Sequence, residues 1–74
     1  MKKYVAIAPE VGEIHSYLTN GRKYPIIEIC KNNNHEYGRM FKMLDDVGFM
    51  LICNEFKCAH LEDVGNWTIK EVKK

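Results

Sequence analysis

The sequence lacks a long hydrophobic run. No window approaches the ~20 consecutive apolar residues that a membrane-spanning helix requires. The first apolar stretch, residues 4–8, is cut off by Pro9 and Glu10, so it is shorter than the roughly 7–15 residues of a signal-peptide core. Neither a membrane span nor export is expected, so the sequence predicts a cytoplasmic protein.

The sequence also lacks a large excess of positive or negative charge. Eleven Lys and Arg residues balance ten Asp and Glu residues, for a formal net charge of +1. Such a balance provides no strong field to attract nucleic acid or an anionic membrane. Repeats, low-complexity tracts and Pro/Gly/Ser linkers are absent, and 74 residues suffice for one core. The chain is therefore expected to form a single domain over residues 1–74.

The cysteines are too few for a disulfide framework. The three residues are Cys30, Cys53 and Cys58, and an odd number in a short chain is typical of reduced thiols. Stability is therefore expected to come from packing.

Apolar residues recur with the period of two that is typical of half-buried β-strands. Five strands are expected, at residues 3–8, 24–30, 39–44, 49–53 and 67–72. The predicted core consists of the apolar residues on one face of each strand: Val5, Ile7, Ile27, Ile29, Phe41, Met43, Phe49, Leu51, Trp67 and Ile69.

The segments between the strands carry turn signals. The Asn20–Gly21 pair favours a tight turn with positive φ, and residues 45–48 predict a type I turn closed by a left-handed glycine. Residues 31–36 suit a solvated hairpin loop. A helix or 3₁₀ turn over residues 54–64 is predicted to begin at an Asn54 cap and to end at Gly65.

The opening strand and three later segments carry a family resemblance, in order along the chain: residues 18–27 (LTNGRKYPII), 41–48 (FKMLDDVG) and 58–67 (CAHLEDVGNW). The three segments resemble the turn-then-strand, the Asp-Asp-x-Gly hairpin and the closing loop of small SH3-like β-barrel proteins encoded by bacteriophages and prophages. The resemblance implies an all-β fold, an SH3-like small barrel of about five antiparallel strands with at most one short helical turn. It implies an accessory phage or prophage protein in the cytoplasm of a bacterial host, and that family has no common activity.

The predicted function is a non-enzymatic protein-binding module. We expect residues 9–20 and the hairpin at residues 31–39 to contact a host or phage protein, such as a component of a host process or a defense system, without a cofactor. The candidate binding residues are His15, Tyr17, Asn33, His35, Tyr37 and Arg39. Met40 and Met50, if they face outward, would form an adaptable apolar patch for a partner.

Nucleic-acid binding is one alternative, because small barrels stack bases on exposed aromatic rings. The residues that such binding would use are Tyr4, Tyr17, Tyr24 and Tyr37 with Arg22, Lys23, Arg39 and Lys42. Acidic residues are interleaved with these cations, so the sequence shows no local basic excess outside its two ends.

A small zinc-stabilised domain is the second alternative. Cys53, Cys58 and His60 supply thiolate and imidazole ligands, with Cys30 or His35 as a fourth, but their spacing departs from the two close ligand pairs of structural sites. Cys58 and His60 are also residue types that can act as a nucleophile and a base. No third group or oxyanion loop accompanies them, so an enzyme is not expected.

Overall fold

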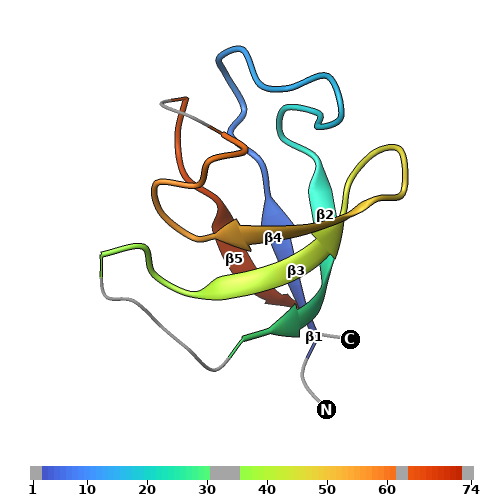
Figure 1. The fold of residues 1–74 in the computed structure, drawn as a ribbon, viewed down its shortest axis with the longest axis vertical. Helices are drawn as coiled ribbons and strands as arrows, with labels where there is room; N and C mark the ends of the chain where they lie inside the picture. The colour runs from blue at the N-terminus through green and yellow to red at the C-terminus, as the bar shows by residue number, and fades with distance from the viewer. Residues whose placement is uncertain (1–2, 31–35, 62–63, 73–74) are drawn as a thin grey trace.

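The computed structural model describes residues 3–30, 36–61 and 64–72. Its five strands are β1 (Lys3–Ile7), β2 (Lys23–Ile29), β3 (Met40–Leu44), β4 (Met50–Asn54) and β5 (Thr68–Val72) (Figure 1). All pairings are antiparallel, in the order β4-β3-β2-β1-β5. The predicted all-β fold is confirmed, and each expected strand is present within one residue at either end. None of the described residues belongs to a helix that could cross a membrane.

The sheet bends within β2, because the first part of this strand pairs with β1 and the second part pairs with β3. β2 pairs with β1 through Pro25 and with β3 from Ile26 onward, and its register shifts between Ile26 and Glu28. A bulge of this kind bends the strand and increases its twist. β3 and β4 consequently cross in front of β1 and β5 (Figure 1).

The curled sheet is consistent with a small SH3-like barrel, but it is not closed. Within the described residues, β4 and β5 are not neighbours in the sheet. The segments beside them approach each other, because the backbone N–H of Trp67 donates to the carbonyl of Glu55 at 3.1 Å.

The core lies between the two halves of the sheet. Its buried members are Ala6, Ala8, Leu18, Tyr24, Phe41, Met43, Cys53, Cys58, Leu61 and Trp67. The Trp67 ring meets the rings of Phe41 and Tyr24 edge-on, each with centroids 5.8 Å apart. Burial of Phe41, Met43 and Trp67 confirms their prediction as core residues, whereas Ile29, Leu51 and Ile69 are half-buried.

The predicted inward face of β1 was wrong. Ala6 and Ala8 are buried, whereas Val5 and Ile7 on the opposite face are only half-buried. Small inward side chains let β1 lie close to the bulky core rings.

Two further core predictions are also wrong. Ile27 is 55% exposed, because the bulge breaks the alternation and lets Ile26 and Ile29 both pack against the core. Phe49 is 69% exposed and precedes β4 in the turn. A period-two pattern assumes continuous strands, and it fails at a bulge and at a turn.

Both predicted glycine turns are confirmed. Gly21 has φ +72° and lies within a turn in which the carbonyl of Thr19 accepts a hydrogen bond from the N–H of Arg22. Gly48 has φ +91°, and its N–H donates to the carbonyl of Asp45 at 3.2 Å.

The helix predicted for residues 54–64 is not observed in their described part. Asn54 belongs to β4 instead of capping a helix, and Lys57 has φ +54°, which interrupts helical geometry. Two local hydrogen bonds remain, from Leu61 N to Cys58 O and from Val64 N to Leu61 O. Residues 62–63, and residues 31–35 of the expected hairpin loop, lie outside the described residues.

Candidate functional site

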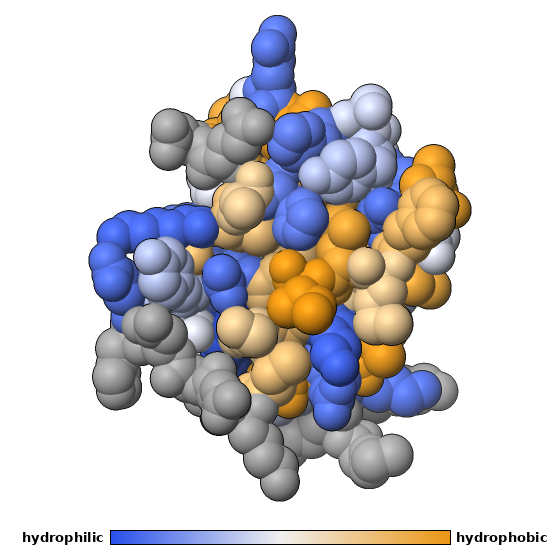
Figure 2. All heavy atoms as spheres, viewed as in Figure 1, coloured by the Kyte–Doolittle hydropathy of each residue, from blue (hydrophilic) through white to orange (hydrophobic). Residues whose placement is uncertain are grey.

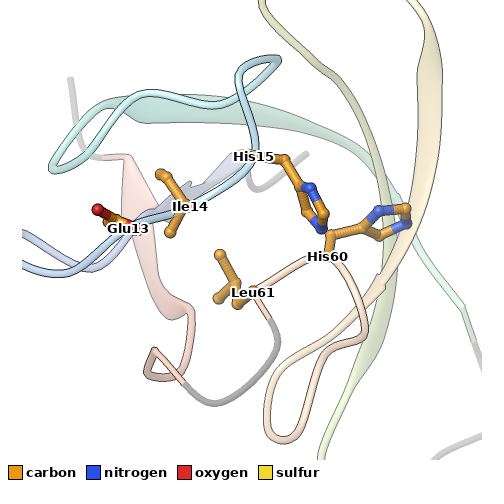
Figure 3. A pocket seen from close by; sticks show the side chains of 5 residues that line it. All are labelled: Glu13, Ile14, His15, His60 and Leu61. Atoms are coloured by element: carbon orange, nitrogen blue, oxygen red, sulfur yellow. The ribbon is translucent and has the colours of Figure 1, made fainter.

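A pocket lies between the loop that joins β1 to β2 and the turn that follows β4. Glu13, Ile14 and His15 line it from the loop, and His60 and Leu61 line it from the turn (Figure 3). Its volume is about 200 Å³. Figure 3 shows the apolar side chains between the carboxylate at one end and the two imidazoles at the other. The pocket therefore has apolar walls and polar ends.

The two histidines of the pocket are joined through Tyr17. The ring of His15 stacks on that of Tyr17, with centroids 5.0 Å apart and an interplanar angle of 7°. The Tyr17 hydroxyl lies 3.0 Å from Nδ1 of His60, and the two rings meet edge-on. In the neutral imidazole with its proton on Nε2, Nδ1 accepts this bond. The contact holds the loop against the turn.

A hydrogen-bond network centred on Asp46 fixes the loop from the other side. The backbone N–H of Asp46 donates to the carbonyl of Tyr17 at 2.9 Å. Its carboxylate accepts from the Thr19 hydroxyl at 2.7 Å, from the Tyr24 hydroxyl at 2.8 Å and from the Arg22 guanidinium at 2.9 Å. The Tyr24 hydroxyl in turn accepts from the backbone N–H of Thr19 at 2.8 Å. The loop is thereby tied to the β3–β4 hairpin.

The same network shifts the ionisation of its members. Hydrogen bonding from Thr19, then from Tyr24 and Arg22, holds the pKa of Asp46 below its ordinary value against the opposing effect of burial. Burial, and then the neighbouring Asp46 carboxylate, raises the pKa of Tyr24. Asp46 is therefore an anion that three donors stabilise.

The sequence missed this network. The Asp45–Asp46 pair predicted only a turn, and that holds for Asp45, whose Oδ1 accepts from the backbone N–H groups of Val47 and Phe49. The side-chain partners of Asp46 lie 22 to 27 residues earlier in the chain. No local pattern signals such a contact.

Tyr37 and Arg39, both predicted to bind a partner, lie along the segment after β4. The carbonyl of Tyr37 accepts from the N–H of Phe56 at 2.8 Å. The Arg39 guanidinium donates to both carboxylate oxygens of Glu55, at 3.2 and 3.3 Å. This pairing raises the pKa of Arg39 and lowers that of Glu55. Arg39 is therefore engaged within the domain.

The predicted binding residues thus separate into three groups. His15 and Tyr17 are in contact at the pocket, while Tyr37 and Arg39 border the segment after β4. Asn33 and His35 lie outside the described residues. The sequence missed the pocket residues Glu13, Ile14 and Leu61, and it offered His60 only as a metal ligand or base.

Cys53 and Cys58 form a buried pair of free thiols. A hydrogen bond between the two thiols is the largest cause that lowers the pKa of Cys58, and the backbone N–H of Asn54 contributes in the same direction. The same bond and burial raise the pKa of Cys53. Both sulfurs are shielded from solvent.

The structure does not assemble the zinc site considered from the sequence. Among the described residues, no group of three or more His, Cys, Asp or Glu side chains lies close enough to hold a metal ion. Cys53 and Cys58 are neighbours, but the His60 imidazole bonds to Tyr17. Cys30 is half-buried elsewhere, and His35 lies outside the described residues. Nor are Cys58 and His60 arranged as nucleophile and base, because the thiol is buried.

Several groups considered for nucleic-acid binding are engaged inside the domain. The ion pairs are Arg22–Asp46, Arg39–Glu55 and Lys42–Glu28. The ring of Tyr24 is buried, and the Arg22 guanidinium lies 5.4 Å from its centroid. These cations are therefore balanced by nearby carboxylates, which weakens their attraction for phosphates.

Comparison with known proteins gives no relative. No protein-family model matches the chain, and no curated protein or solved structure matches it either. The kinship with phage and prophage barrels stays a prediction, and the SH3-like description depends on strand order and curvature alone.

Proposed function

We propose that the protein is a non-enzymatic protein-binding module that receives one side chain of a partner polypeptide in the pocket between the β1–β2 loop and the turn after β4. The observation that carries the proposal is the pocket itself. Its volume of about 200 Å³ is smaller than the roughly 300–1,000 Å³ of small-molecule and cofactor sites. A single long side chain is the occupant of that size.

The lining favours a side chain with an apolar stem and a cationic end. Ile14 and Leu61 offer apolar contact along the walls, and Glu13 offers a carboxylate at one end. Lysine and arginine bury their methylene stems on apolar surface while the charged group stays at a polar rim. We therefore propose an exposed lysine or arginine of a partner protein as the recognised group.

The surroundings of the pocket support recognition without large rearrangement. The Asp46 network holds the loop, and the contact between Tyr17 and His60 fixes the turn against it. Elements that are already ordered lose less conformational entropy when a ligand binds. That the partner is a host or phage protein stays a prediction from the family resemblance.

Affinity capture from bacterial lysate, with and without nuclease, tests the proposal. We expect the parent protein to retain a protein partner after nuclease treatment and Glu13→Arg to lose it, because the variant places a cation where the partner's cation binds. Glu71→Arg is the control, since it makes the same charge change at an exposed position of β5.

Equal retention by Glu13→Arg and the parent contradicts a role for the pocket. Retention of nucleic acid alone, abolished by nuclease and weakened by salt, would instead support the alternative of a nucleic-acid-binding barrel.

A further inference from the structure

Large apolar side chains are exposed together on the outer side of β3, β4 and the hairpin between them. They are Leu44, Val47, Phe49, Met50 and Ile52, which are between 48% and 69% exposed. We call this set the hairpin face. Figure 2, in which β4 lies toward the viewer, shows apolar side chains gathered over these strands. Single exposed apolar residues are ordinary, whereas the largest contiguous apolar patch of a protein is often functional.

Strand register and turn geometry hold the hairpin face outward. Leu44 pairs with Met50 and Lys42 pairs with Ile52, so these side chains share the outer side of the sheet. The carboxylate of Asp45 fixes the turn through the N–H groups of Val47 and Phe49. The face is therefore part of the rigid scaffold, and its exposure does not depend on a loose loop.

The charges beside the hairpin face neutralise each other. Lys42 on β3 and Glu28 on β2 are cross-strand partners, with Nζ and Oε1 3.3 Å apart. A face with one balanced ion pair has no preference for an acidic or a basic partner. It does suit a second copy of itself, in which Lys42 of one copy meets Glu28 of the other. Two chains of net charge +1 also repel each other little.

We infer that the hairpin face is where two copies of this chain meet about a two-fold axis. In such an interface the same surface is used twice, so each apolar side chain gains a counterpart from the other copy. At roughly 60–120 Å² of apolar area for a fully exposed side chain, the five residues provide about 300 Å² per copy. Because such surfaces are about 60% apolar, each copy would bury about 500 Å².

An interface of that size predicts a weak, reversible dimer. Standard protein interfaces bury about 800 Å² per partner, and specific contacts begin near 1,000 Å² in total. The hairpin face lies at this lower limit, where contacts are weak and transient. The inference is independent of the proposed function, because the pocket and the hairpin face share no residue.

Sedimentation velocity from about 1 µM to about 1 mM tests the inference. We expect the parent to pass from monomer to dimer over this range and Ile52→Glu to raise the dissociation constant at least about tenfold. Ile52 lies opposite Lys42, so the introduced carboxylate gains a cross-strand cation and the monomer keeps its fold. Val11→Glu is the matched control, because Val11 is 79% exposed in the β1–β2 loop, outside the face.

A parent that stays monomeric throughout overturns the inference. So does a dimer that Ile52→Glu leaves intact, or one that Val11→Glu weakens as much. If Ile52→Glu is unfolded by thermal melting, Phe49→Gln replaces it, since Phe49 lies in the exposed turn. The same loss of dimer is then required.

Discussion

Replacing Asp46 by asparagine tests the network that ties the β1–β2 loop to the hairpin. A hydrogen bond to a charged group contributes about 1.5–3 kcal/mol to stability. The contribution of Arg22 is smaller, below ~1 kcal/mol, because its side chain is 57% exposed and the pair is screened by solvent. The asparagine oxygen can still accept from Thr19 or Tyr24. We therefore expect Asp46→Asn to lower the free energy of unfolding by about 2 kcal/mol.

The pH dependence of this loss follows from the direction of the pKa shift. The pKa of Asp46 is lowered in the folded protein. Its stabilising contribution is therefore fully present above the unfolded value of about 4, and it is lost as the pH falls through the folded value. The difference between the parent and Asp46→Asn should be constant from about pH 5 to about pH 8 and should close toward about pH 2.

Urea unfolding at several pH values, followed by the fluorescence of Trp67, measures the difference. Glu71→Gln is the control, because it removes a carboxylate from an exposed position of β5. A loss below ~0.5 kcal/mol at neutral pH, within the range of ordinary surface changes, would refute the reasoning. A loss that is equally large at the acid end would show that the charge of Asp46 is not its source.

The remaining predictions concern the core and the thiols. Phe41→Ala and Trp67→Ala should each cost about 3–5 kcal/mol, because both side chains are buried in contact with one another; thermal melts within a few degrees of the parent would contradict this core. In the native protein a thiol reagent should label the half-buried Cys30 first, and Cys53 and Cys58 only as the chain unfolds. Mass spectrometry of the labelled peptides checks the order, and rapid labelling of Cys58 would contradict its burial.

The sequence predicted the strands well because their signals are local. Phe41 and Met43 alternate with Lys42 inside one uninterrupted strand, and both are buried. Four consecutive residues, 45–48, determine the turn before β4. The Asp45 carboxylate accepts from the backbone within the turn, and Gly48 adopts the positive φ that the turn requires.

The inward face of a strand was harder to predict, because it depends on packing. Ile27 and Ile29 have the spacing of one face, yet the bulge between Ile26 and Glu28 places Ile27 outside. On β1, the larger side chains predicted Val5 and Ile7 as core, whereas the buried side chains of this strand and its end are those of Ala6 and Ala8. Volume and curvature, which sequence spacing does not encode, decide both cases.

The pocket was predictable only in part, for the same reason. His15 and Tyr17 are two residues apart and stack on each other, so their association has a local signal. Their contact with the turn after β4 joins Tyr17 to His60, 43 residues away. The tertiary fold alone makes that contact.

A dimer formed through the hairpin face would carry two copies of the pocket. The backbone bond between Asp46 and Tyr17 joins the hairpin to the loop that lines the pocket, so a dimer formed through the hairpin face would hold two ordered pockets at a fixed separation. A partner with two suitably spaced cationic side chains would then bind the second pocket intramolecularly, at an effective concentration set by that geometry. One pocket of about 200 Å³ gives little affinity by itself. Pairing weak pockets through a weak dimer is a physical route by which a domain of 74 residues can bind selectively.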